Sequence, residues 1–255
     1  MRRYFNTEGL CDTKEHYMVR LDSRLADIKH FYVDRKKYFV MNRGRQYGKT
    51  TTLYALAAYL KEEYTVLSLD FQELTTEDFV NEGVFVRAFS RLLMDAAGLL
   101  DEESRKVLSE PLKEFSAFTA NHSLIELFIC LSGLCVKAQR PVVLMIDEAD
   151  SASNNQVFLD FLAQLRGYYL ARRKKPVFHS VILAGVHDIK NLKLKLRPEA
   201  EHKYNSPWNI SADFDMDMNF SSAQVAAMLQ EYASPSILPS AALSSVNDAT
   251  DWQET

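Results

Sequence analysis

The chain has 255 residues, of which 47% are hydrophobic and 25% are charged, and its formal net charge is −4 at pH 7. This length and composition are typical of a globular protein with a substantial core, built as one large domain or one domain with a small appendage. They exclude a strongly basic overall field that would attract nucleic acid or an anionic membrane. No stretch approaches the about 18 apolar residues of a membrane span, and the amino terminus lacks an apolar signal-peptide stretch, so we expect a cytoplasmic protein without a membrane partner.

The first predicted strand leads into an unusual loop. Residues 38–42 (YFVMN) are apolar until the chain turns polar at Arg43, which predicts a buried strand. Residues 42–51 read NRGRQYGKTT, and apolar residues then recur at helical spacing. A strand that passes through a tight loop into a helix is the setting of a phosphate-binding (Walker A) loop. That pattern begins with a glycine five residues before Gly48, but Arg43 holds the position here and Gly44 follows one residue late.

The residue types in this loop suit a nucleotide. Backbone N–H groups of such a loop, with the helix terminus behind them, form a nest for the β-phosphate. Gly48 would let the backbone approach the phosphates, Lys49 would bridge the β- and γ-phosphates, and Thr50 would ligate Mg²⁺. The alternative is that Gly-Lys-Thr only begins a helix, with Thr50 or Thr51 as its N-cap. The predicted nucleotide-binding residues are Arg43, Gly44, Arg45, Gln46, Tyr47, Gly48, Lys49, Thr50 and Thr51.

Further strands and helices alternate along the chain. Apolar runs predict strands at residues 64–71, 141–146 and 180–184. Helical spacing predicts helices within residues 76–138, with an apolar one near 123–138, then after the strand at 141–146, and finally at 221–232 with Ser221 or Ser222 as N-cap. This alternation predicts an α/β fold, a three-layer α/β/α sandwich around a mainly parallel sheet, as in P-loop NTPases.

A second motif follows the strand at residues 141–146. Asp147 and Glu148 come directly after an apolar run, which is the pattern of the second nucleotide motif (Walker B). Asp147 would order the Mg²⁺ shell, and Glu148 would polarise the attacking water as general base. The alternative is a pair of carboxylates that caps the next helix, although Asp150 or Ser151 fits that role better. The spacing of the two motifs allows an extra strand between the phosphate-loop strand and the Asp-Glu strand.

These motifs together resemble a known family. The segments RGRQYGKT, VVLMIDEAD, ILAGVHD and NSPWNISADF are similar to those of bacterial AAA-ATPase-like proteins, relatives of the archaeal-type ATPases within the AAA+ and STAND group of P-loop NTPases. The loop of that family commonly reads R-x-R-x-aromatic-G-K-[ST], which Arg43, Arg45 and Tyr47 match, and Tyr-Val-Asp at residues 32–34 agrees with a segment upstream. The resemblance covers about residues 5–232.

The resemblance implies roles for individual residues. Lys49 and Thr50 would contact phosphate and Mg²⁺, Asp147 would order the metal, and Glu148 would be the catalytic base. The strand at residues 180–184 takes the place of the sensor strand, where Ser180 and His187 are the nearby polar candidates. Candidate arginine fingers are Arg166 and Arg197.

The resemblance also frames the domain organisation. We expect residues 1–30 to be an N-terminal extension that packs on the core, residues 31–232 to be the AAA-ATPase-like domain, and residues 233–255 to be a poorly ordered tail rich in Ser, Ala and Pro. Relatives usually continue into a helical or winged-helix lid and often a nuclease-like domain, so we expect the lid and C-terminal domain to be absent or truncated.

The leading functional hypothesis is a Mg²⁺-dependent ATPase that hydrolyses the β–γ phosphoanhydride of ATP and acts as a conformational switch for an unknown partner. The alternatives are an ATP-binding regulatory module with little turnover and, disfavoured by the Asp-Glu pair, a small-molecule kinase. ATP is preferred over GTP because the chain has no Asn/Thr-Lys-x-Asp stretch of the guanine-reading kind. A homo-oligomer or another protein is the expected partner. Nucleic acid is not indicated, although the basic residues in 190–197, a candidate edge strand (NLKLKLR at 191–197), are compatible with it.

Overall fold

The computed structural model describes residues 3–7, 9–44, 47–185 and 208–233. The chain divides into two compact units, Arg24–Asp217 and the combination of Met1–Ser23 with Met218–Thr255. The predicted strand at residues 191–197, the sensor candidate His187, the finger candidate Arg197 and the tail after residue 233 lie outside the described residues.

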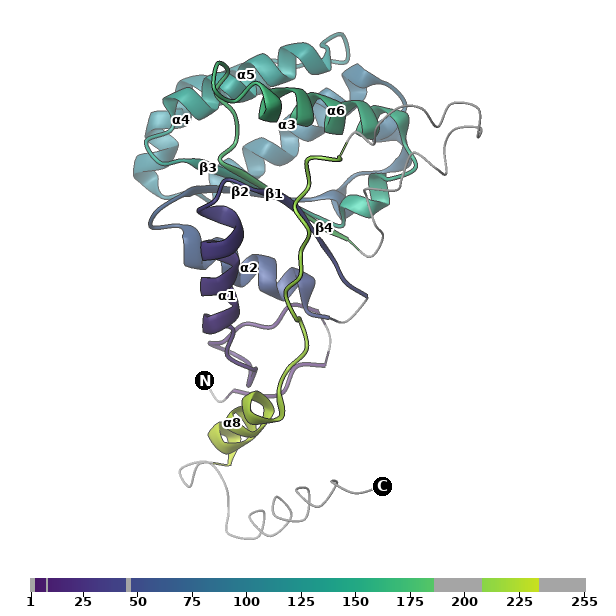
Figure 1. The fold of residues 1–255 in the computed structure, drawn as a ribbon. Coiled ribbons are helices and arrows are strands. Elements are labelled where there is room, and N and C mark those ends of the chain that lie inside the picture. The colour runs from purple at the N-terminus through teal and green to yellow at the C-terminus, as the bar shows by residue number, and fades with distance from the viewer. Residues whose placement is uncertain (1–2, 8, 45–46, 186–207, 234–255) are drawn as a thin grey trace. The chain divides into compact units, whose positions relative to one another are not determined.

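Among its described residues, the larger unit contains a four-stranded parallel sheet (Figure 1). The strands are β1 (Tyr38–Asn42), β2 (Thr65–Asp70), β3 (Val142–Asp147) and β4 (Ser180–Gly185), in the order β1-β4-β3-β2. Strand β4 therefore lies between the phosphate-loop strand and the Asp-Glu strand, which confirms the predicted extra strand. The carboxyl ends of these strands all lie at the same end of the sheet, because every pair is parallel.

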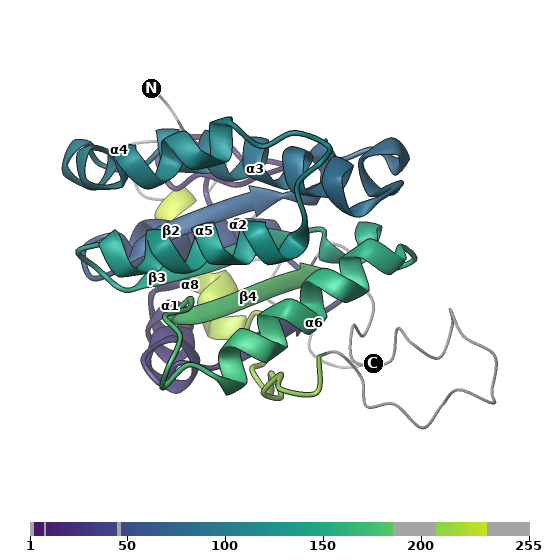
Figure 2. The same cartoon turned by 90° about the horizontal axis from the view of Figure 1, so that it is seen from above.

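Helices cover both faces of the sheet, as the alternating pattern predicts. Figures 1 and 2 show α3, α5 and α6 over one face and α2 under the other. The helices of this unit are α1 (Asp22–Ile28, which begins in the smaller unit), α2 (Lys49–Leu60), α3 (Glu82–Gly98), α4 (Glu102–Ser116), α5 (Leu124–Lys137) and α6 (Gln156–Leu170). A π-helical turn at Lys29–Val33 and short 3₁₀ turns at Phe71–Glu73, Thr76–Phe79 and Ala149–Ala152 connect them.

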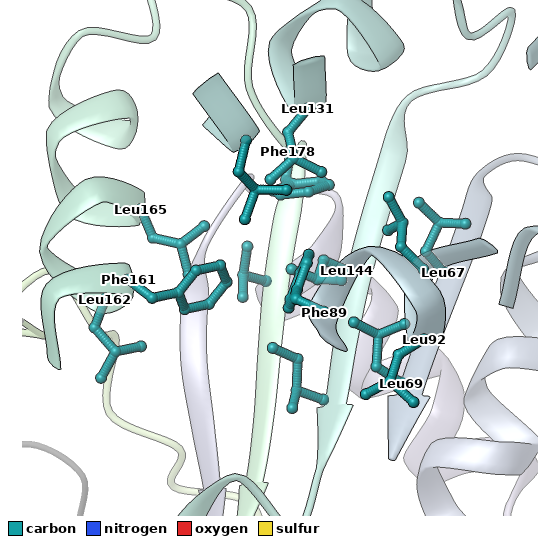
Figure 3. Close-up of a cluster of buried hydrophobic side chains, with 14 of the residues drawn as sticks. Leu67, Leu69, Phe89, Leu92, Leu131, Leu144, Phe161, Leu162, Leu165 and Phe178 are labelled. Atoms are coloured by element: carbon teal, nitrogen blue, oxygen red, sulfur yellow. The ribbon is translucent and has the colours of Figure 1, made fainter. Parts of the chain in front are cut away.

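The main core lies between the sheet and the helices α3, α5 and α6. Alternate residues of the strands point to this face, among them Leu67, Leu69 and Leu144 (Figure 3). They meet a cluster of aromatic rings from the helices, where the Phe89 and Phe161 centroids lie 5.0 Å apart. Strands β3 and β4 are buried at every residue, which is why their sequences are continuous apolar runs.

Local capping signals account for most helix starts. Ser123 and Glu126 form a capping box at α5, and Ser221 forms one at α8 (Ser222–Tyr232), as predicted. The expected cap of the helix after the Asp-Glu pair is wrong. Residues Ala149–Ala152 form a 3₁₀ turn instead, and α6 begins later, with Asn155 at its N-cap position.

The smaller unit joins the amino-terminal segment to α8. Tyr4 pairs with His16 in an isolated β-bridge, and Arg3 donates to the Glu231 carboxylate at 2.6 Å. The Phe5 ring lies 5.0 Å from that of Tyr232.

None of the helices among the described residues has the length and apolar character that crossing a membrane requires.

Candidate functional site

Helix α2 begins directly behind the phosphate loop, with Gly48 at its N-cap position. Gly48 has φ 67° and ψ 29°, a left-handed conformation that glycine adopts far more readily than other residues. No side chain caps the first N–H groups of α2, which are the positive end of the helix dipole. Thr50 and Thr51 lie inside the first turn, so the alternative that one of them is the N-cap is wrong. This helix end presents backbone donors suited to an anion.

The Lys49 side chain is folded back into the loop. Only 7% of the residue is exposed, and its Nζ donates to the carbonyls of Arg43 at 2.9 Å and Gly44 at 3.0 Å. An ammonium group has three donors, which can also serve phosphate oxygens. The predicted lysine therefore places its charge within the loop.

The late glycine of the loop has a steric role. A Cβ atom on Gly44 would lie 3.3 Å from Cε2 of Tyr47, a tight contact, so the absence of a side chain lets the tyrosine ring close against the loop. Tyr47 remains 44% exposed, and Thr50 is exposed as well. Arg45 and Gln46 lie outside the described residues.

Arg43 points toward a distant segment of the chain. Its guanidinium donates to the carbonyl of Asn42 at 3.0 Å, of Phe214 at 3.0 Å and of Met216 at 2.9 Å. The group also lies 5.6 Å from the centroid of the Phe214 ring. A direct contact of Arg43 with nucleotide therefore stays a prediction from the sequence.

Two carboxylates stand side by side at the ends of β2 and β3. Asp70 and Asp147 are register partners in the parallel pair. Asp147 is 7% exposed, and its Oδ1 accepts a hydrogen bond from the Glu148 N–H at 2.9 Å. Sequence reasoning assigned no role to Asp70, although an aspartate at the end of an apolar strand parallel to β3 is a signal that could have found it. Its Oδ1 accepts from the Gln72 N–H at 2.8 Å.

Glu148 has an uncommon backbone conformation. Its φ of 50° and ψ of 34° lie in the left-handed region, which costs free energy for any residue with a Cβ and recurs at functional sites. Burial raises the pKa of the Glu148 carboxyl, the nearby Asp150 and Asp147 carboxylates raise it further, and the Lys49 ammonium acts in the opposite direction. Asp70 also contributes. These charges thus gather around one carboxyl group, and a raised pKa makes it a better proton acceptor.

Asp150 lies against the end of β4. A Cβ atom on Gly185 would lie 2.7 Å from Oδ1 of Asp150, closer than such atoms approach in proteins. Gly185 is the register partner of Asn42, the last residue before the loop. The missing side chain at Gly185 therefore makes room for Asp150, the fourth carboxylate of this group after Asp70, Asp147 and Glu148.

Comparison with known proteins identifies the family. The sequence model of the AAA-like domain family matches residues 38–242. The chain belongs to the AAA-like domain family. This confirms the resemblance noted in the sequence and supports a nucleotide-binding, ATPase-type function. A comparison with curated proteins finds no match.

A solved structure supports the fold of this AAA-like domain. A Walker-type ATPase of Pyrococcus abyssi matches with a TM-score of 0.57 and 16% identity, over 92% of this chain and 63% of that chain. The Orc1 protein of Aeropyrum pernix, solved in complex with DNA, matches with a TM-score of 0.46 and 12% identity, over 85% of this chain and 50% of that chain. The chain thus spans less than two thirds of either protein.

Two of the sensor and arginine-finger candidates of the AAA-like domain lie within the described residues, Ser180 and Arg166. Neither joins the site. Ser180 begins β4, so it lies at the amino end of the sheet, and its Oγ donates to the Lys37 carbonyl at 2.6 Å. The prediction that Ser180 serves as sensor is wrong for this reason. Arg166 donates from Nε to Oδ1 of Asn209 at 2.6 Å, and no described contact ties it to the loop.

The residues of the AAA-like domain fit a magnesium nucleotide. Mg²⁺ prefers oxygen ligands and is usually held by one or two carboxylates together with substrate phosphates. Thr50 supplies a hydroxyl in the first turn of α2, and Asp147 supplies a carboxylate at the end of β3. In the described part of the chain, no group of three or more His, Cys, Asp or Glu side chains is arranged to hold a metal ion.

Proposed function

We propose that this AAA-like domain binds ATP with Mg²⁺ and hydrolyses its β–γ phosphoanhydride, as a conformational switch for a partner. The observation that carries the proposal is the pairing of two features at the carboxyl end of the sheet. One is the uncapped start of α2 with the buried Lys49 beside it. The other is the cluster of carboxylates around Glu148, where the nearby Lys49 ammonium acts to lower the pKa of the Glu148 carboxyl.

Each of these groups at the carboxyl end of the sheet has its own role in the proposal. The α2 N–H groups and the Lys49 ammonium bind the phosphates and neutralise their charge. Thr50 and Asp147 hold Mg²⁺, which when bound stabilises the negative charge of the phosphates. Glu148 accepts a proton from the attacking water. Water rather than a substrate hydroxyl is the proposed acceptor of the phosphoryl group, because Asp147-Glu148 after a buried strand matches the second nucleotide motif of ATPases with a catalytic glutamate.

A phosphate-release assay with Glu148→Gln tests this proposal. Gln keeps the size of the side chain but cannot accept the proton, so turnover should fall by about 100-fold or more while ATP binding is retained. Glu62→Gln, an exposed site beyond the end of α2, is the matched control and should release phosphate like the native chain. Equal turnover in Glu148→Gln and the native chain would remove Glu148 from the mechanism.

The same assay separates the two proposed modes of action. If the native chain binds Mg²⁺-ATP but releases no phosphate, the domain is a regulatory module that holds ATP without turnover. Phosphate release that requires Mg²⁺ and Glu148 supports the ATPase.

A further inference from the structure

The free edge of β1 is covered by residues 211–217, which we call the edge segment. Ala212 pairs with Phe39 in a parallel β-bridge, and its N–H donates to the Tyr38 carbonyl at 2.8 Å. The Phe214 ring stacks on Phe39 with centroids 5.5 Å apart and an interplanar angle of 8°. Figure 1 shows this segment, in yellow-green, passing β1, with which it forms this bridge. Backbone bonding and one aromatic stack therefore hold the edge segment on the sheet.

A tyrosine adds a further contact to the edge segment. Tyr32 is 6% exposed, and its ring lies 5.3 Å from that of Phe214. Its hydroxyl accepts a hydrogen bond from the Asp215 N–H at 3.1 Å. The backbone amides of Ala212 and Asp215 are thus both hydrogen-bonded within this unit and can report on how firmly the segment is held.

Arg43 connects the phosphate loop to the edge segment. It is the first residue after β1, and its Nη2 donates to the carbonyls of both Phe214 and Met216. A guanidinium is a planar fork with five donors, so it can bridge two carbonyls while it stacks on the Phe214 ring. A lysine could not reproduce this geometry, because its ammonium is a compact point charge.

The backbone of the same arginine is held by the lysine of the loop. Lys49 Nζ donates to the carbonyls of Arg43 and Gly44. The two carbonyls occupy two of the three ammonium donors, so a lysine that bridges a β- and a γ-phosphate oxygen must release one of the carbonyls. Any change of partner at Lys49 therefore acts on the backbone of Arg43, whose side chain holds the edge segment. That segment continues directly into Met218, where the smaller unit resumes.

We propose that Arg43 is a positioning residue that transmits nucleotide binding at the phosphate loop to the edge segment, and through it to the chain connection with the smaller unit. The inference rests on the proposed function, because it requires a nucleotide whose phosphates engage Lys49. Nucleotide binding loosens the edge segment by drawing Lys49 away from the Arg43 carbonyl.

Hydrogen exchange of the full chain, with and without saturating Mg²⁺-ADP, tests this coupling. In the native chain the amides of residues 212–216 should exchange about two- to tenfold faster with nucleotide, the effect of weakening about one hydrogen bond. In Arg43→Met these amides should exchange about tenfold faster than native without nucleotide and show no further change with it. Arg43→Lys keeps the charge and should lie between the two.

Arg172→Met is the matched control. Arg172 also donates to a carbonyl, that of Tyr169 at 2.9 Å, and lies 4.0 Å from the centroid of the same residue's ring. Both contacts are at the exposed end of α6, so this variant should keep the native response of residues 212–216.

The outcomes separate the inference from the proposed function. Native protein that binds Mg²⁺-ADP without any exchange change at residues 212–216 would overturn the coupling and leave the proposed function intact. A native-like response in Arg43→Met would also overturn it. Loss of nucleotide binding in both Arg43 variants would assign Arg43 to the phosphates instead. A native chain that binds no nucleotide would overturn the proposed function and the coupling together.

Discussion

The two ends of the same parallel sheet satisfy their polar groups in different ways. At the amino end, polar side chains bond to backbone, as when Ser180 Oγ donates to the Lys37 carbonyl and the Tyr38 hydroxyl donates to the Phe178 carbonyl at 3.0 Å. At the carboxyl end, charged groups gather instead, and Gly48 and Glu148 both have left-handed backbones. A left-handed residue also occurs at the amino end, Lys36 with φ 56°, so the two ends differ in the charge that gathers around Glu148 rather than in backbone strain.

Asp147→Asn should show a large effect that distinguishes the two ends. Loss of the carboxylate should weaken Mg²⁺ binding to the nucleotide complex by about 10- to 100-fold. Asp160→Asn, on the exposed side of α6, is the matched control and should bind Mg²⁺ like the native chain. Calorimetric titration of Mg²⁺ into the protein with ADP measures this, and equal affinities for both variants would take Asp147 out of the metal site.

Gly185→Ala should have the next largest effect. The new Cβ would meet Asp150 Oδ1 at 2.7 Å, so we expect a loss of about 2 kcal/mol in the free energy of unfolding. Replacing Asp150 by Ala in the same chain should restore most of that loss, because the two changes share one contact. Gly167→Ala has open space around its new Cβ and is the control. Additive effects of the two substitutions in urea denaturation would contradict the close approach.

Gly48→Ala tests the left-handed turn before α2. An alanine at φ 67° should cost about 1–2 kcal/mol of folding free energy, since its Cβ crowds the following carbonyl. Gly48→Asn should cost less because asparagine tolerates this region better. Thermal denaturation of the two variants gives the order, and an alanine variant as stable as the asparagine variant would contradict the assigned conformation.

Ser180→Ala should have the smallest effect, and it should change the stability of the protein rather than its binding of nucleotide. The serine is fully buried, and its removal leaves the Lys37 carbonyl without this donor, at a cost of about 1 kcal/mol. Nucleotide affinity should not change. A nucleotide-binding defect without a loss of stability would return Ser180 to the sensor role that its position argues against.

Local patterns predicted much of the fold. Strand β1 occupies the predicted residues 38–42, and Ser123 caps α5, because apolar runs and caps act over a few neighbouring residues. The direction of a parallel strand also follows from the sequence, so the placement of Ser180 at the wrong end could have been avoided. Glu148 of the Asp-Glu pair lies near enough to Lys49 for that ammonium to act on the pKa of its carboxyl, as its position after a buried strand suggests.

The contacts that sequence could not predict depend on tertiary structure. Arg43 reaches a carbonyl 171 residues later in the chain, and no local pattern encodes such a partner. The left-handed conformation of Glu148 and the 3₁₀ turn behind it replace the expected helix cap, since local propensity alone would favour neither. Asp70 gains its significance from register with Asp147 across two strands.

The most direct test of the difference between the two ends is a calorimetric titration of Mg²⁺-ATP into Lys49→Ala beside Ser180→Ala. Lys49→Ala should weaken binding by about 100-fold or more, because it removes a charge-assisted contact to the phosphates. Ser180→Ala should bind like the native chain. Native affinity in a folded Lys49→Ala protein would contradict the assignment of the nucleotide site to the carboxyl end of the sheet.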